Sequence, residues 1–277
     1  MISLKTSGKA TEKTKIYIKG GNSMGKYNLG LVSISFRSAS VEELIKAVKD
    51  AGLACIEWGS DVHAPQYSHE KLQEIVKLQN EYGISCSSYG TYFRLGKNSI
   101  DEMKAYIDAA KCLGTDILRV WCGEKAPQNY SEEEKESFFA ECSKAAHIAE
   151  ENGVILCMEC HHGTFTDTKE GMKELMENIN SGNFLMYWQP NQYVNDEKNL
   201  EYAQEVVPYC KAVHAFNWEG NNKLPLSQAE DLWKRYLGIL KDTDTVLLEF
   251  MPDDRLESLK IEASALRKIT EEIKEDE

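Results

Sequence analysis

The sequence predicts an α/β fold, a single-domain (β/α)8 barrel, on three observations. From Tyr27 onward, eight short apolar or β-branched runs alternate with eight longer stretches of helical periodicity, without a linker between them. This alternation predicts a parallel sheet whose strands are joined by helices. Eight parallel strands close into a barrel, and the length of 277 residues suits one, because such barrels run to roughly 250 residues.

The expected strands are the eight apolar runs. They span residues 28–35, 54–59, 84–90, 116–121, 154–160, 184–190, 212–218 and 245–251. The expected helices span residues 41–51, 69–82, 99–113, 131–152, 168–180, 196–207, 227–240 and 254–274. Ser40 and Ser131 precede acid-rich first turns, as helix N-caps do. An open doubly wound sheet is the alternative fold, but no glycine-rich turn follows the first expected strand.

Composition narrows the classes of partner. A net charge of −13 would repel a phosphate backbone, so we expect no nucleic-acid partner. No apolar run approaches the roughly 20 residues that a membrane helix needs, so we expect no membrane partner. The eight cysteines are scattered through expected strands and helices, which favours reduced thiols in the cytoplasm. Cys157 and Cys160 form a CxxC, but residues three apart on a strand face opposite sides.

Residues 1–26 differ in composition from the remainder of the chain. They hold six lysines and one acidic residue, Glu12, and they lack the apolar core of a secretory signal. We expect a disordered basic leader here, with a basic targeting arm as the alternative, and the barrel over residues 27–277.

Polar and ionisable side chains gather at the carboxyl ends of the expected strands, where barrels of this kind build their active sites. The candidates are Glu57, His63, Arg119, Trp121, Glu159, His161, Gln189, Gln192, His214 and Glu249. Strand alternation places Glu159 on the same face as Cys157 and Ile155. We therefore expect apolar layers inside the barrel and a polar layer at its mouth.

Four of these side chains form a candidate metal site. Glu159, Gln189, His214 and Glu249 come from the fifth to the eighth strands, one from each. Two carboxylates, an imidazole and an amide oxygen suit Mn, Mg or Zn. A structural alternative is that Arg119 pairs with Glu57 or Glu159 and serves only to neutralise their charge.

Several segments resemble the xylose isomerase-like barrel superfamily, which includes sugar and sugar-phosphate isomerases and epimerases, inosose and 3-dehydroshikimate dehydratases and, more distantly, endonuclease IV. They are SISFR, GLACIEWGSDVHAP, LRVWCG, MECHHGTFTDT and VLLEFMPD. The resemblance implies metal ligands at Glu159, His214 and Glu249. The fourth ligand of the family is an Asp, and a His commonly follows it three residues later, whereas this chain has Gln189 and Gln192. We therefore expect a weaker site.

The resemblance implies proton transfer next to a carbonyl of a sugar or polyol, with Glu159 and Glu249 as acid and base. Glu57, His63, Arg119, Trp121, His161 and Gln192 are the expected substrate-binding residues. A sugar or sugar-phosphate isomerase or epimerase is the leading expectation. A dehydratase of a cyclic polyol ketone or of a dehydroshikimate-type acid is the second, and a carbohydrate-binding barrel that has lost its metal is the third. Homo-oligomers are common in the family.

Overall fold

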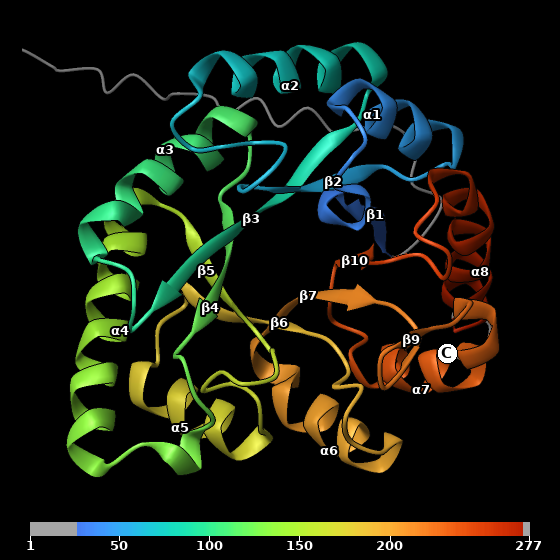
Figure 1. Ribbon diagram of the computed structural model, residues 1–277. Helices are drawn as coiled ribbons and strands as arrows, with labels where there is room; N and C mark the ends of the chain where they lie inside the picture. Colours follow the sequence, from blue (N-terminus) through green and yellow to red (C-terminus); the bar gives the residue numbers. More distant parts are fainter. Residues whose placement is uncertain (1–26, 274–277) are drawn as a thin grey trace, which may run out of the picture.

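The computed structural model describes residues 27–273, in which eight parallel strands form a closed barrel within a ring of helices (Figure 1). The barrel strands are β1 (Asn28–Val32), β2 (Cys55–Gly59), β3 (Ser85–Leu95), β4 (Ile117–Cys122), β5 (Ile155–Glu159), β6 (Phe184–Trp188), β7 (Cys210–Ala215) and β10 (Thr245–Leu248). β10 pairs with β1 and closes the ring. The predicted fold class is confirmed, whereas the predicted leader at residues 1–26 lies outside the described residues.

Within residues 27–273, eight α-helices follow the strands in turn. They are α1 (Val41–Asp50), α2 (His69–Tyr82), α3 (Met103–Leu113), α4 (Glu132–Asn152), α5 (Lys169–Ile179), α6 (Asp196–Val206), α7 (Glu230–Ile239) and α8 (Leu259–Glu272). Ser40 and Ser131 form capping boxes with the third residues of α1 and α4. In the described part of the chain, no helix combines the length and apolar character needed to cross a membrane.

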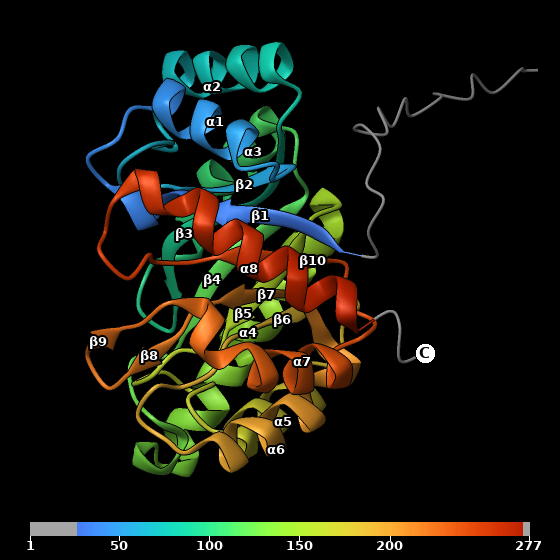
Figure 2. The same cartoon turned by 90° about the vertical axis from the view of Figure 1, so that its right-hand side faces the viewer.

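Some element boundaries differ from the predicted ones. β1 ends at Val32, because Ser33–Phe36 turns into a short 3-10 helix. β7 starts at Cys210 and ends at Ala215, before the predicted limit. Beyond it, β8 (Trp218–Glu219) and β9 (Asn222–Lys223) form a small antiparallel hairpin that was not predicted from the sequence. Figure 2 shows this hairpin at the end of the barrel where the strands finish.

The buried residues form two separate cores, as strand alternation requires. The inner core fills the barrel and includes Cys157, Tyr187 and Leu247. The outer core packs between the strands and the helices and includes Cys160. Cys157 and Cys160 therefore face opposite sides of β5, and all eight cysteines are free. The apolar inner layers place the polar ends of the strands at the barrel mouth.

Candidate active site

A cavity of about 360 Å³ lies at the carboxyl ends of the strands. Its lining residues are Ile34, Arg37, Tyr92, Arg119, Trp121, Glu159, His161, His162, Gln189, Gln192, Tyr193, Phe216, Trp218, Glu249 and Phe250. Ionisable groups lie at its floor and aromatic rings form much of its wall. This combination of apolar walls with a few convergent polar groups is typical of a small-molecule site.

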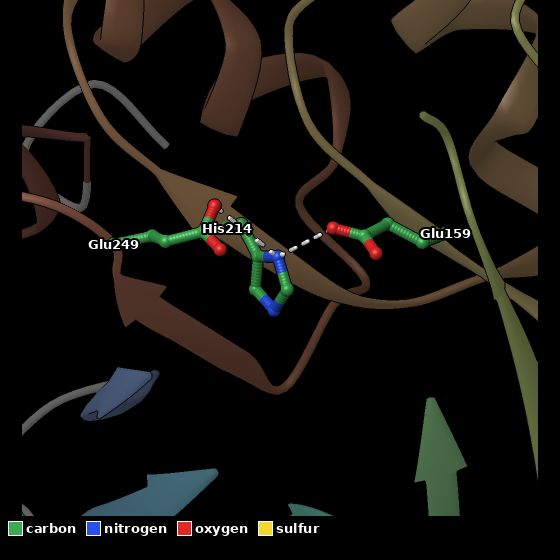
Figure 3. Close-up of side chains that lie close together, drawn as sticks. All are labelled: Glu159, His214 and Glu249. Atoms are coloured by element: carbon green, nitrogen blue, oxygen red, sulfur yellow. Dashed lines mark ion pairs between the residues drawn. The ribbon is translucent and has the colours of Figure 1, made fainter. Parts of the chain in front are cut away.

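Glu159 and Glu249, which line the cavity, converge on His214, which is completely buried and does not line it (Figure 3). Glu159 is the last residue of β5, His214 lies on β7, and Glu249 directly follows β10. The Nδ1 atom of His214 is 3.5 Å from Oε1 of Glu159 and 3.7 Å from Oε2 of Glu249. One potential ligand atom from each of the three residues lies within 4.8 Å of the other two. Barrel closure thus brings together three residues that span 91 positions of sequence, from 159 to 249.

Gln189 joins the same cluster from the loop after β6. Its Oε1 atom lies 3.2 Å from Nδ1 of His214, closer than either carboxylate. The amide oxygen of Gln189 therefore points toward Nδ1 of His214, as the carboxylates of Glu159 and Glu249 do. The structure brings all four predicted ligand residues together, and their role in binding a metal stays a prediction.

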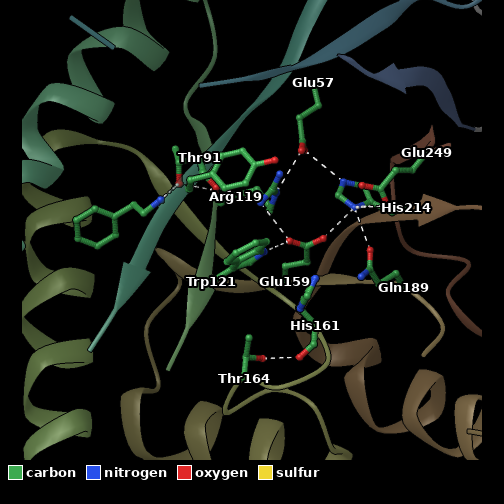
Figure 4. Close-up of polar contacts among 12 residues, drawn as sticks. Glu57, Thr91, Arg119, Trp121, Glu159, His161, Thr164, Gln189, His214 and Glu249 are labelled. Atoms are coloured by element: carbon green, nitrogen blue, oxygen red, sulfur yellow. Dashed lines mark hydrogen bonds and ion pairs between the residues drawn. The ribbon is translucent and has the colours of Figure 1, made fainter. Parts of the chain in front are cut away.

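A buried ion-pair network adjoins this cluster (Figure 4). Arg119 on β4 lies 3.2 Å from Oε1 of Glu57 through its Nε atom and 3.1 Å from Oε2 of Glu159 through Nη1. The same Nη1 donates to the carbonyl of Thr91 at 3.0 Å. Glu57 on β2 is completely buried, and its Oε2 accepts a hydrogen bond of 2.8 Å from Ser88. Arg119 therefore pairs with both Glu57 and Glu159, the two partners predicted as alternatives from the sequence.

Trp121 and Thr166 hold Glu159 from two sides. The indole Nε1 of Trp121 donates to the carboxylate of Glu159, and the hydroxyl of Thr166 donates to its backbone carbonyl at 2.6 Å. The ring of His161 lies 4.7 Å from that of Trp121, and the guanidinium of Arg94 lies 4.4 Å above the same indole. These contacts hold the side chain and the backbone of Glu159 in place, in addition to its ion pair with Arg119.

The buried charges shift the pKa values of the cluster in different directions. Burial alone would raise the pKa of Glu159, but Arg119 and His214 outweigh it and hold that pKa well below its usual range. Burial would lower the pKa of His214, but the surrounding carboxylates, Glu249 and Glu57 foremost, raise it to about 10. Burial together with the charge of Glu159 raises the pKa of Glu249 to about 7.

The other predicted substrate-binding residues divide into two groups. Arg119, Trp121, His161 and Gln192 line the cavity. His63 does not: it is buried, and its ring nitrogens lie 3.2 Å from Ser33 Oγ and from the carbonyl of Ala39. Glu57 lies beneath the cavity floor, where it contacts Arg119 and His214 but does not line the cavity itself.

Several lining residues were not among the candidates predicted from sequence. Arg37 follows the 3-10 turn after β1, and it pairs with Asp61 and donates to the hydroxyl of Tyr92. Tyr193, Phe216 and Phe250 also line the cavity. Loop residues give no periodic signal, so only their closeness in sequence to a strand end could have suggested them.

The sequence also matches a known family. The family model described as xylose isomerase-like TIM barrel matches residues 45–269, most of the chain. The chain belongs to this family. A search of curated proteins finds no significant match.

Solved structures show the same fold at low sequence identity. A probable 3-DHS dehydratase from Bacillus anthracis has 18% identity and a TM-score of 0.72, with 87% of this chain and 98% of that chain covered. D-psicose 3-epimerase from Clostridium cellulolyticum H10 has 13% identity and a TM-score of 0.66, with 89% and 99% covered. A 3-keto-D-glucoside 4-epimerase from E. coli has 11% identity and a TM-score of 0.67, with 88% and 100% covered.

The donor set of this xylose isomerase-like barrel fits a divalent cation. Metal bonds of about 2.1 Å place neighbouring ligand atoms about 3.0–3.4 Å apart in octahedral or tetrahedral sites. The distances from Nδ1 of His214 to the three oxygens are similar, at 3.2–3.7 Å. The charges also match. With His214 neutral, as a metal ligand must be, the carboxylates of Glu57, Glu159 and Glu249 face one positive charge within this cluster of described residues, that of Arg119. Two negative charges would then remain for one divalent ion to neutralise.

Proposed function

We propose that this protein is a metal-assisted sugar isomerase or epimerase that moves a proton next to a carbonyl group. The observation that carries the proposal is the convergence of Glu159 and Glu249, two residues that line the cavity, on the buried imidazole of His214. Two carboxylates that reach a common point allow one group to remove a proton and the other to return one from the opposite face of the same carbon. A carbohydrate-binding barrel without a metal would not need two buried carboxylates, whose desolvation is costly.

The four donors would be Glu159, Gln189, His214 and Glu249, with Mn, Mg or Zn as the ion. When bound, the metal would act as a Lewis acid on a carbonyl and a neighbouring hydroxyl of the substrate. The chain's own residues perform the proton transfer: one of Glu159 and Glu249 removes the proton from carbon and the other returns one. Transfer to the opposite face of the same carbon gives epimerisation, and transfer to the neighbouring carbon gives isomerisation.

The paired arginines favour an uncharged sugar over a sugar phosphate. Arg37 and Arg119 line the cavity, and each already pairs with a carboxylate, Asp61 for Arg37 and Glu159 for Arg119. Among the described residues that line the cavity, none is a lysine. A phosphate would therefore have to displace an existing ion pair, whereas hydroxyl groups can hydrogen-bond to the paired groups as they stand. The aromatic wall, with Trp121 and Trp218, suits the apolar faces of a sugar.

A lyase that dehydrates a polyol ketone is the second candidate. It would use the same two carboxylates, one to remove a proton and one to protonate the leaving hydroxyl. A probable dehydratase with a similar fold is the observation that supports this candidate. A substrate that carries a carboxylate, such as a dehydroshikimate-type acid, meets the same obstacle as a phosphate, because it finds no unpaired arginine in the cavity wall.

Product analysis in deuterated water tests the proposal. The purified protein would be incubated with Mn²⁺ and a panel of neutral ketohexoses and aldohexoses, their phosphates, inososes and dehydroshikimate. We expect a new neutral sugar that carries deuterium at the carbon next to the carbonyl, as detected by NMR and chromatography. Loss of water to give an unsaturated product would replace the isomerase proposal with the lyase.

Three variants give this assay its controls. Glu159→Gln and Glu249→Gln each remove an acid–base group and should lower turnover by roughly 100-fold or more, because positioned acid–base groups contribute about 10²–10⁴-fold. Glu262→Gln alters another buried carboxylate, which accepts a hydrogen bond from the backbone N–H of Leu226 and does not line the cavity, and should retain turnover. Equal turnover in all three variants would contradict the assignment.

A further inference from the structure

Glu57 is a buried carboxylate that the proposed proton transfer does not use. It is completely buried on β2, on the opposite side of His214 from the other carboxylates. Its two oxygens have different partners: Oε1 lies 3.2 Å from Nε of Arg119, and Oε2 lies 3.4 Å from Nε2 of His214. Burying a charge is costly, and a partner for Arg119 is already available in Glu159. The contact with His214 therefore calls for a separate explanation.

The contact determines which nitrogen of His214 is free to bind. The two ring nitrogens face different groups: Nε2 faces Glu57, and Nδ1 faces the oxygens of Gln189, Glu159 and Glu249. A neutral imidazole carries its proton on one nitrogen and a lone pair on the other. With the proton on Nε2 and directed to Glu57, the lone pair of Nδ1 points at the other three donors. Carboxylates that hold a metal-binding histidine in this way fix its ring and its tautomer.

The charge of the cluster also depends on Glu57. Glu159 and Glu249 give two negative charges, Arg119 gives one positive charge, and Gln189 gives none. With His214 neutral, the cluster without Glu57 would have a charge of −1, and a bound divalent ion would leave a net charge of +1. With Glu57 the cluster has a charge of −2, which a divalent ion would neutralise. The third carboxylate thus comes from β2 on one side of His214, while a neutral amide occupies the position after β6 on the other side.

We propose that Glu57 is a positioning residue of the metal site, which orients His214 through Nε2 and supplies the negative charge that Gln189 lacks. This inference rests on the proposed metal-assisted function. It predicts that the position of the negative charge can change. A carboxylate at position 189 should restore most of the Mn²⁺ affinity that is lost when residue 57 is neutral.

The test is a cycle of variants in the full chain, with Mn²⁺ affinity measured by calorimetry and by electron paramagnetic resonance at one pH. Glu57→Gln keeps an acceptor for Nε2 and removes the charge, and it should weaken Mn²⁺ binding by roughly 10–100-fold, the usual effect of losing such a partner. The double variant Glu57→Gln with Gln189→Glu should regain most of that loss. Glu262→Gln is the matched buried-carboxylate control and should bind as the wild type does.

Two results would overturn the inference. One is a folded Glu57→Gln variant whose Mn²⁺ affinity stays within about twofold of the wild type, and the other is a double variant as weak as Glu57→Gln. If Glu57→Gln does not fold, Glu57→Asp decides. It keeps the negative charge but shortens the side chain, which draws the carboxylate away from His214, so affinity should fall roughly tenfold, and unchanged affinity would refute the role. A wild type that binds no Mn²⁺ would instead refute the metal-assisted function itself.

Discussion

His214 is the residue on which the proposed metal site is centred. It is completely buried, and its two nitrogens contact four acceptor side chains: Glu57, Glu159, Gln189 and Glu249. Without a metal, a proton on the ring can satisfy the carboxylates around it, which explains why they raise the pKa of His214 to about 10. In the proposed site, a cation and a proton would thus compete for the same nitrogen.

This competition makes Mn²⁺ affinity depend on pH. Burial and the charge of Glu159 raise the pKa of Glu249 to about 7, while its carboxylate neighbours raise that of His214 to about 10. Metal binding must release both protons below pH 7 and only the proton of His214 above it. The logarithm of the association constant should therefore rise by about two per pH unit below pH 7 and by about one above it. Calorimetry from pH 6 to 8.5 measures this slope, and a flat profile would contradict it.

Strand β3 shows how an element positions the site without contributing a ligand. Gly90 lies beside the ion-pair network, and a Cβ atom at this position would come within 2.5 Å of Oε1 of Glu57 and 3.0 Å of Nη2 of Arg119. Only a glycine leaves room for both side chains. The strand thus determines the space in which the carboxylate and the guanidinium meet.

Gly90→Ala should therefore disturb both the fold and the metal site. We expect a loss of about 1–3 kcal/mol in the free energy of unfolding, the usual cost of overpacking, together with weaker Mn²⁺ binding. Gly182→Ala is the control, because a Cβ atom there meets nothing within 4 Å. Chemical denaturation and calorimetry provide the two measurements. Equal values for both variants would show that Gly90 has no steric role.

The elements differ in how far sequence could predict them. Helices α2 and α4 were predicted to within one residue of their observed bounds, because their apolar periodicity and their ends are explicit in the sequence. The end of β1 was predicted wrongly, because the apolar pattern continues beyond Val32 whereas Ser33–Phe36 forms a 3-10 helix. Phe250 has a positive φ of 55°, which no pattern of residue types announces.

At the scale of the molecule, barrel closure is what assembles the site. Strand order could be predicted, and with it the meeting of Glu159, His214 and Glu249 at one mouth. The contacts between side chains could not be predicted from the sequence, because they depend on strand register and side-chain conformation. Examples are the contact of Glu57 with Nε2 of His214 and that of Trp121 with Glu159. The same dependence placed His63 in a buried contact with Ser33, away from the cavity.

Because its ligands lie on or directly after four neighbouring strands of the closed barrel, β5, β6, β7 and β10, a bound metal should stabilise the whole fold. At a concentration 100 times its Kd, a ligand adds about 2.7 kcal/mol to the free energy of unfolding, which corresponds to a rise of about 5–10 °C in Tm for a chain of this size. Thermal unfolding with and without Mn²⁺ measures the shift. The variant His214→Asn should lose most of it, and the same shift in both proteins would place the bound metal elsewhere.

The most direct measurement is an anomalous diffraction map of crystals soaked in Mn²⁺. We expect one strong peak at the cavity floor, about 2.0–2.3 Å from an oxygen of Glu159, an oxygen of Glu249, Oε1 of Gln189 and Nδ1 of His214. Nε2 of His214 should remain directed at Glu57. A map with no peak there, at a Mn²⁺ concentration that fills other sites in the crystal, would contradict the metal site and the chemistry proposed from it.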